Sequence, residues 1–145
     1  MAKATQNFQN HVRLVPTFHF VVLPILLLNF VWSIVGVIRT FSFGTVVSLL
    51  LAIALVLLAF NARLFALTVQ NRVIRLEMRM RLEQLLPADL RTRVPEFTVD
   101  QLVALRFAGD AELPELARKV LQENLKDRTA IKKLVRDWQA DFVRA

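Results

Sequence analysis

Two long runs of apolar residues near the start of the chain dominate its hydrophobic pattern. The first, residues 18–38, carries no formal charge when His19 is neutral, and the second, residues 45–67, meets its first charge at Arg63. As helices rising about 1.5 Å per residue, both runs cover the roughly 30 Å hydrocarbon core of a bilayer. The pattern therefore predicts two transmembrane helices.

The connector between the two runs, residues 39–44, is too short to fold by itself. It predicts antiparallel neighbouring helices, which form a transmembrane hairpin. A cleaved signal sequence is the alternative reading of the first run, but that run exceeds the usual apolar length of roughly 7–15 residues and a second run follows at once. Basic residues lie before the first run and after the second, with Arg39 alone in the connector. The positive-inside rule then places both termini in the cytoplasm.

The second helix is expected to continue beyond the membrane. No proline or glycine occurs between Thr45 and Leu86, and the stretch after the membrane run is rich in Arg, Glu, Leu and Met, which favour helix. We therefore predict one helix of about 40 residues. Residues 45–67 of this helix cross the membrane, and residues 68–86 form a cytoplasmic continuation. The chain before the first helix, residues 1–17, is predicted to be cytoplasmic as well.

Two apolar stripes on nearly opposite faces mark the cytoplasmic continuation. One stripe comprises Val69, Val73, Leu76 and Met80. The other, our candidate for docking a partner, comprises Leu67, Ile74, Met78, Leu82 and Leu85. Either the chain covers both stripes itself, one with its C-terminal domain and the other with the segment before the first helix, or one stripe meets another subunit or another protein.

Small residues gather on one sector of the second membrane helix and let helix backbones approach closely. They are Gly44, Ser48, Ala52, Ala59, Ala62 and Ala66. This candidate packing face closes the hairpin or joins two copies of the chain, and the pattern alone does not decide between the two.

The remaining residues, 87–145, predict a small bundle of short helices. Thr98 and Gln101 form a capping box that starts a helix over about 99–108, and Gly109 is its expected stop. Asp110 is expected to cap the next helix. Asp127 is expected to cap the last one in the same way. The apolar face of that last helix comprises Ile131, Leu134, Val135, Trp138 and Phe142.

Composition and charge support a membrane protein. The chain is 55% hydrophobic with a mean hydropathy of +0.45, too apolar for an ordinary soluble domain. Its net charge of +7 lies mostly near the membrane runs, since residues 87–145 hold eleven basic and ten acidic side chains. We expect the arginines that follow the second run to contact anionic lipid headgroups. They are Arg63, Arg72, Arg75 and Arg79.

No pattern of chemistry-bearing residues predicts catalysis, a cofactor or a metal. The chain has no cysteine, and its only histidines are His11 and His19. Its carboxylates occupy positions typical of solvated helix faces, and none lies in the apolar runs. Two helices around Gly109 resemble a helix-turn-helix, but acidic residues at the start of the second helix have the wrong sign for DNA. We therefore expect neither an enzyme nor a nucleic-acid-binding protein.

Three stretches carry a resemblance to a known group of proteins. They are QNFQNHVRLVPTFHF at the start, FALTVQNRVIRLEMRMRLEQLLP in the extended helix, and FTVDQLVALRFAGDAELPELARKVL with AIKKLVRDWQADFVRA at the end. The chain resembles a family of small, functionally uncharacterised bacterial inner-membrane proteins. The resemblance implies a bacterial source, two membrane spans and no assigned activity.

The sequence as a whole predicts an all-α membrane protein: a two-span hairpin, an extended second helix and a small helical bundle. The leading functional hypothesis is a non-catalytic accessory subunit or scaffold that docks a protein partner through the extended helix and the bundle. The alternative is a self-assembling homo-oligomer with a structural role or a role as a channel or transporter component. Asn29, Ser33 and Asn61 would be the only polar lining of such a channel.

Overall fold

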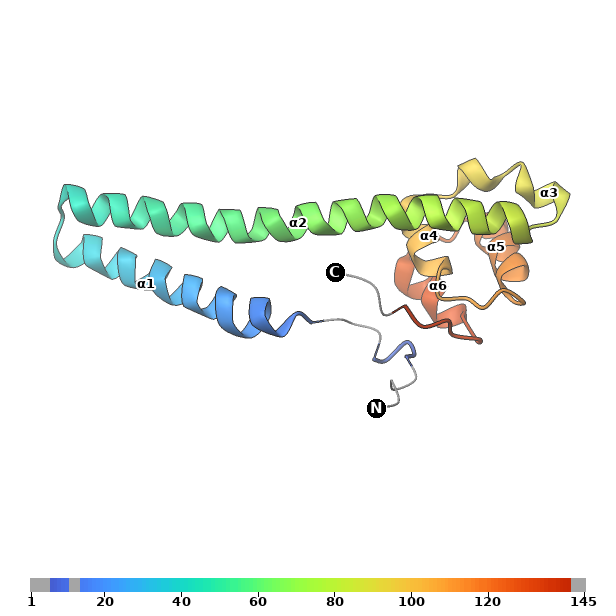
Figure 1. Ribbon diagram of the computed structural model, residues 1–145, viewed down its shortest axis with the longest axis horizontal. Coiled ribbons are helices and arrows are strands. Elements are labelled where there is room, and N and C mark those ends of the chain that lie inside the picture. The colour runs from blue at the N-terminus through green and yellow to red at the C-terminus, as the bar shows by residue number, and fades with distance from the viewer. Residues whose placement is uncertain (1–5, 11–13, 142–145) are drawn as a thin grey trace. The chain divides into compact units, whose positions relative to one another are not determined.

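The computed structural model describes residues 6–10 and 14–141, which form two compact units. One unit contains residues 14–67, and the other contains residues 6–10 with residues 68–141. Within these residues the regular structure is helical throughout and no strand forms, as the sequence predicted for the fold class (Figure 1).

The first apolar run begins with a π-helical segment, η1 (Thr17–Val22), and continues as α1 (Leu23–Arg39). The backbone N–H of Leu23 donates to the carbonyl of Phe18, five residues back, as in a π-helix. Pro24 follows directly and lies in the first turn of α1, where its missing N–H costs least. The backbone therefore accommodates Pro24 by changing its hydrogen-bond register ahead of the proline.

The second helix, α2 (Phe43–Leu85), is uninterrupted, which confirms the predicted continuation past residue 67 (Figure 1). Ser42 starts it. The Ser42 Oγ accepts from the Thr45 N–H at 3.3 Å, and the Thr45 Oγ1 accepts from the Ser42 N–H at 3.1 Å. This reciprocal pair satisfies two backbone donors at the helix start. The segments Thr17–Arg39 and Phe43–Leu85 are both long and apolar enough to cross a membrane.

Five short helical segments follow α2 in the other unit. They are α3 (Ala88–Arg91), the 3-10 turn η2 (Val94–Glu96), α4 (Val99–Leu105), α5 (Leu113–Gln122) and α6 (Arg128–Leu134). Their apolar faces form one core with the last turns of α2. The largest fully buried side chains of this core are Leu82, Leu86, Leu102, Leu105, Phe107, Leu113, Val120 and Ile131.

Two of the predicted helix caps are confirmed. The Thr98 Oγ1 accepts from the Gln101 N–H at 3.2 Å, and the Gln101 Oε1 accepts from the Thr98 N–H at 2.8 Å. The Gln101 amide also donates to the carbonyl of Leu125 at 2.9 Å, so both ends of this buried amide are hydrogen-bonded. At α6 the Asp127 carboxylate accepts from the Ala130 N–H at 2.8 Å.

Exposed ion pairs connect the short helices. Arg118 of α5 pairs with Asp89 of α3 at 3.0 Å, and Arg128 of α6 pairs with Asp100 of α4. Arg93 pairs with Glu96 across η2 at 2.8 Å, and its hydrogen bond and charge lower the pKa of the Glu96 carboxyl. Pairs this exposed contribute little to stability, so the apolar core and the caps hold the unit together.

The last helix is shorter than predicted. α6 ends at Leu134, and the chain continues in extended form as a segment that pairs with the residues after α4. The Gly109 N–H donates to the Asp137 carbonyl at 2.8 Å, and the Gln139 N–H donates to the Phe107 carbonyl at 2.7 Å. The prediction of one helical face through residue 142 was therefore wrong between 135 and 141, and Phe142 lies outside the described residues.

Trp138 reaches the core from this extended segment. Its ring stacks on the Phe107 ring with the centroids 4.6 Å apart and the planes 19° from parallel. Beside this pair, the buried Arg106 guanidinium lies 4.6 Å from the Phe107 ring centroid and pairs with Asp141 at 3.2 Å. Aromatic stacking and cation–π contacts thus replace the helical packing that the sequence suggested for Trp138.

Gly109 has a different role from the one predicted. α4 already ends at Leu105, and no described glycine has the positive φ of a helix stop. A Cβ on Gly109 would instead lie 2.0 Å from the Asp137 Oδ2 atom. The Asp137 side chain fills the space that a side chain on residue 109 would need, and the glycine leaves room for it.

Candidate functional site

The candidate partner-docking stripe of α2 is covered by the chain itself. Ile74, Met78 and Leu82 are 5%, 3% and 0% exposed, and they belong to the same core as the helices that follow. Leu85 is partly buried against that core. Leu67, in the other unit, is partly exposed. The prediction that this stripe docks a separate protein was therefore wrong for its buried members, because the C-terminal helices occupy it.

The opposite stripe of α2 is open. Val69, Val73, Leu76 and Met80 are 61%, 48%, 62% and 52% exposed. An apolar row of this length is unusual on a soluble surface and commonly marks an interaction site. We call these four residues the exposed stripe. It is the candidate functional site of this unit.

The segment before the first helix does not cover the exposed stripe with its described residues. Gln6 instead pairs with the chain end, since its amide oxygen accepts from the Asp141 N–H at 2.8 Å. The Lys133 ammonium lies 5.9 Å from the Phe8 ring centroid. Residues 6–10 therefore pack on the C-terminal segment. The expectation that the chain covers both stripes itself therefore holds only for the stripe that contains Ile74, Met78 and Leu82.

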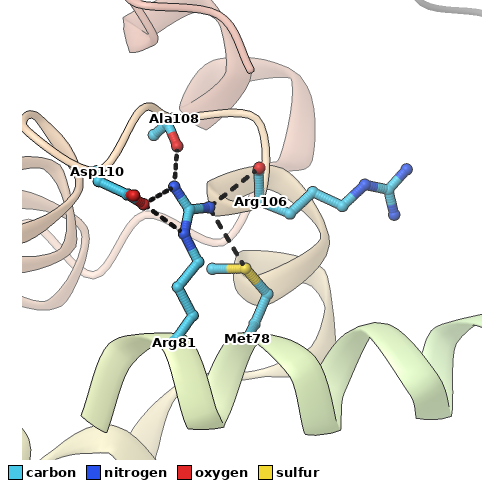
Figure 2. Close-up of polar contacts among 5 residues, drawn as sticks. All are labelled: Met78, Arg81, Arg106, Ala108 and Asp110. Carbon is cyan, nitrogen blue, oxygen red and sulfur yellow. Dashed lines mark hydrogen bonds and ion pairs between the residues drawn. The ribbon is translucent and has the colours of Figure 1, made fainter. Parts of the chain in front are cut away.

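Arg81 fastens α2 to the loop that follows α4 (Figure 2). Its guanidinium donates to the Asp110 Oδ1 from Nε at 2.9 Å and from Nη2 at 2.6 Å. It also donates to two backbone carbonyls, that of Ala108 at 2.7 Å and that of Arg106 at 3.3 Å. Carbonyls at a helix end lack helical partners, so a planar cation with several donors fits this position.

The Arg81 clamp also corrects the prediction for Asp110. α5 starts without a side-chain cap, because the Asp110 carboxylate is taken by Arg81. The Glu112 carboxylate is engaged elsewhere too, and accepts from the Arg136 and Asp137 N–H groups at 3.0 and 3.2 Å. The sequence signal for this clamp was the place of Arg81 on α2, beside the stripe that becomes buried.

We expect Arg81→Met to lower the free energy of unfolding of this unit by about 1–2 kcal/mol, because it leaves two carbonyls without their charged donor. Asp110→Asn should lower it by less, since Asp110 is mostly exposed and its ion pair is screened by solvent. Urea unfolding of the full chain in mild detergent, followed by Trp138 fluorescence in a Trp32→Phe background, measures both. Arg75→Met, on an exposed position of the same helix, is the matched control and should leave the midpoint unchanged.

Charged residues flank the exposed stripe. Arg72 lies on one side and Glu77 on the other, and both are exposed. Within the described part of the chain neither forms an ion pair. Arg79 is half-buried beside Arg72, and its Nε has no hydrogen-bond partner among the described residues. The Arg72 and Glu77 side chains are therefore free to meet something outside the chain.

The candidate lipid-contact arginines are divided between the two units. Arg63 is partly exposed in the unit that holds the apolar helices. In the other unit Arg72 and Arg75 are exposed and Arg79 is half-buried. Their contact with lipid headgroups stays a prediction.

The small residues of α2 differ in how far they are buried. Ala52 is 1% exposed and Ala59 is half-buried, whereas the other four candidates on this face are exposed. Those four are Gly44, Ser48, Ala62 and Ala66. On α1 the buried Ser33 donates from Oγ to the Asn29 carbonyl at 2.8 Å, and a Cβ on Gly36 would meet the Thr45 methyl group at 3.9 Å. Internal contacts therefore use only part of the small-residue face.

No metal-binding group forms within residues 6–10 and 14–141. Those residues contain no group of three or more His, Asp or Glu side chains that could hold a metal ion. A shallow depression of about 170 Å³ lies between α5 and the segment after α6, lined by Glu112, Glu115, Leu116, Lys119, Leu134 and Arg136. His19 hydrogen-bonds locally to the backbone of Val15.

Comparison with known proteins finds a matching family. The whole chain, residues 1–145, matches a family described as a family of unknown function, DUF6526. No curated protein and no solved structure matches the chain.

Proposed function

Since the chain belongs to the DUF6526 family, whose description names no activity, we propose its function from its own geometry: a non-catalytic membrane protein that assembles with a protein partner. Residues 18–38 and 45–67 form a two-span hairpin in a bacterial inner membrane, with both termini in the cytoplasm. The cytoplasmic part of α2 and the small helical unit form a scaffold beyond the membrane.

The hairpin part of this proposal is supported by the two apolar helices and their surroundings. In the most apolar stretch of each helix, Thr17–Arg39 and Phe43–Leu85, only 6% of the residues are buried within the chain. Helices that apolar and that unburied need lipid or another protein around them. The connector Thr40–Ser42 is short, and five basic residues follow the second run between Arg63 and Arg81, which supports cytoplasmic termini.

The exposed stripe carries the assembly part of the proposal. The chain buries one face of the cytoplasmic helix in its own core and leaves the opposite face, four apolar side chains in a row, open to solvent. The hydrocarbon core of a bilayer does not explain that exposure, because the charged residues Arg72, Glu77 and Arg79 border the stripe. A protein surface is the cover that suits an apolar row with a charged border.

Mass measurement tests the assembly. The protein, produced at native level and extracted in mild detergent, should run as a complex heavier than one chain, and Leu76→Arg should shift it towards the monomer. Arg75→Glu, an exposed position of the same helix on the side away from the exposed stripe, should leave the complex intact. A wild-type protein that is monodisperse at the mass of one chain, with nothing co-purifying, would contradict the proposal.

Reporter fusions test the hairpin independently of assembly. A C-terminal reporter that is active only in the cytoplasm should be active, and one that is active only outside the membrane should be silent. A fusion inserted in the connector 40–42 should give the opposite pattern. Activity of the outer reporter at the C-terminus would refute the proposed topology and leave the assembly result untouched.

A further inference from the structure

The exposed stripe has the spacing of a coiled-coil seam. Its members follow one another at steps of four, three and four residues, from Val69 to Val73, Leu76 and Met80. We propose that this seam pairs with the same seam of a second copy of the chain, in a parallel two-stranded coiled coil. The inference rests on the proposed function, since the membrane anchor brings the copies together in the same orientation.

The charges beside the seam fit a parallel pair of identical helices. With Val73 and Leu76 as the first and fourth positions of a heptad, Arg72 precedes the heptad and Glu77 is its fifth position. In a parallel coiled coil these two positions lie opposite each other on the two strands, so Arg72 of each copy faces Glu77 of the other. Both side chains are exposed, and within the described residues neither has an ion-pair partner.

The same charges disfavour an antiparallel pair. In that arrangement each flank of the seam faces the same flank of the other helix. Arg72 and Arg79 would then face arginines of the partner, and like charges at such close positions repel. The flanks therefore select a parallel orientation, which is also the one that two copies inserted alike in a membrane present to each other.

The residue types at the centre of the seam favour two strands. A β-branched residue at the first heptad position with leucine at the fourth is the combination that parallel dimers prefer, and Val73 and Leu76 provide it. Glu83, at the position that follows Met80 in the repeat, ends the seam. Its charge would be unfavourable in the interior of such an interface.

The preceding part of the same helix repeats the spacing. Leu51, Leu55, Leu58 and Ala62 follow steps of four, three and four residues, and all four are exposed. A two-heptad seam is short for a dimer in water, but membrane anchoring raises the effective concentration of its partner.

Single-cysteine crosslinking in membranes tests the seam, because the chain has no cysteine of its own. Val73→Cys and Leu76→Cys should each give a disulfide-linked dimer under mild oxidation, since identical residues at seam positions of a parallel pair lie next to each other. Arg75→Cys, exposed but on the side of α2 away from the seam, is the matched control and should stay monomeric. Equal crosslinking at all three positions, or at none, overturns the proposal.

Charge exchange tests the partner's identity. In the Val73→Cys background, Arg72→Glu alone or Glu77→Arg alone should reduce the crosslinked fraction roughly threefold to tenfold, since each places two like-charge pairs across the interface. The double variant exchanges the two charges and should restore crosslinking to near the original level. Both positions are exposed, so Trp138 fluorescence should show an unchanged fold in every variant. A double variant as weak as the singles overturns the self-pairing.

The mass of the complex separates a failure of this inference from a failure of the proposed function. Twice the chain mass, lost on Leu76→Arg, supports both. A complex that contains a single copy with a different protein, also lost on Leu76→Arg, overturns the self-pairing and leaves the assembly function intact. A monomer without any partner overturns both.

Discussion

Replacing Leu82 with alanine should lower the free energy of unfolding of the helical unit by about 2–5 kcal/mol. Leu82 is 0% exposed and lies in the core that α2 shares with the helices after it. The substitution removes buried apolar surface and leaves a cavity that neighbouring helices fill only in part. Since small domains are stable by only about 5–15 kcal/mol, this loss is a large fraction of the total.

Urea unfolding of the full chain in mild detergent measures the loss, with Trp138 as the fluorescent reporter in a Trp32→Phe background. Leu50→Ala is the matched control, since Leu50 lies on the same helix but is 60% exposed in the apolar part. Its midpoint should equal that of the parent. Equal midpoints for Leu82→Ala and the parent would mean that this face of α2 does not carry the core, and would restore it as a candidate for docking a partner.

Gly109→Ala should strain the pairing between the segment after α4 and the segment after α6. An alanine Cβ would lie 2.0 Å from the Asp137 Oδ2, 2.7 Å from its Cγ and 3.3 Å from its Cβ, so the Asp137 carboxylate has to turn away and its Cβ has to give by a few tenths of an ångström. Such a shift weakens the hydrogen bonds of this pairing and the stacking of Trp138 on Phe107. We expect a loss of about 1–3 kcal/mol, the range of overpacking.

Amide hydrogen exchange, read by mass spectrometry on the full chain, locates this effect. Residues 135–139 should lose protection first, and Trp138 fluorescence should shift towards that of an exposed indole. Gly36→Ala is the control, because its Cβ would meet its nearest neighbour at an ordinary 3.9 Å. Adding Asp137→Ala to Gly109→Ala should recover most of the loss, since only the 3.3 Å contact remains. Without such recovery, the close approach to Asp137 is not the reason for the glycine.

Local chemistry made several features of this chain readable from its sequence. Two apolar runs predicted two helices long enough to cross a membrane, and the absence of proline and glycine from Thr45 to Leu86 predicted that the second continues. The capping box at Thr98 and the cap at Asp127 were also predictable. In each case the interacting atoms lie within a few residues of one another, so their geometry follows from the helix itself.

Features that depend on residues distant in sequence could not be predicted from local patterns. Asp110 is next to a helix start, but Arg81, which lies 29 residues away in sequence, takes its carboxylate. Trp138 has the spacing of a helix face, but hydrogen bonds to Phe107 and Gly109 draw its segment out of the helix. In both cases a long-range interaction satisfies the same polar groups that the local one would have used.

The extended helix α2 has features of both kinds, some set by the local sequence and some set by distant contacts. The sequence by itself determined that α2 has two apolar stripes, because a stripe follows from the 3.6-residue period and the residue types. It did not determine which stripe the chain covers, because both have similar composition and either could pack against the apolar faces of the short helices. Only the tertiary structure decided this, by burying Ile74, Met78 and Leu82 and fixing the register with Arg81. The other stripe was thereby left open for assembly.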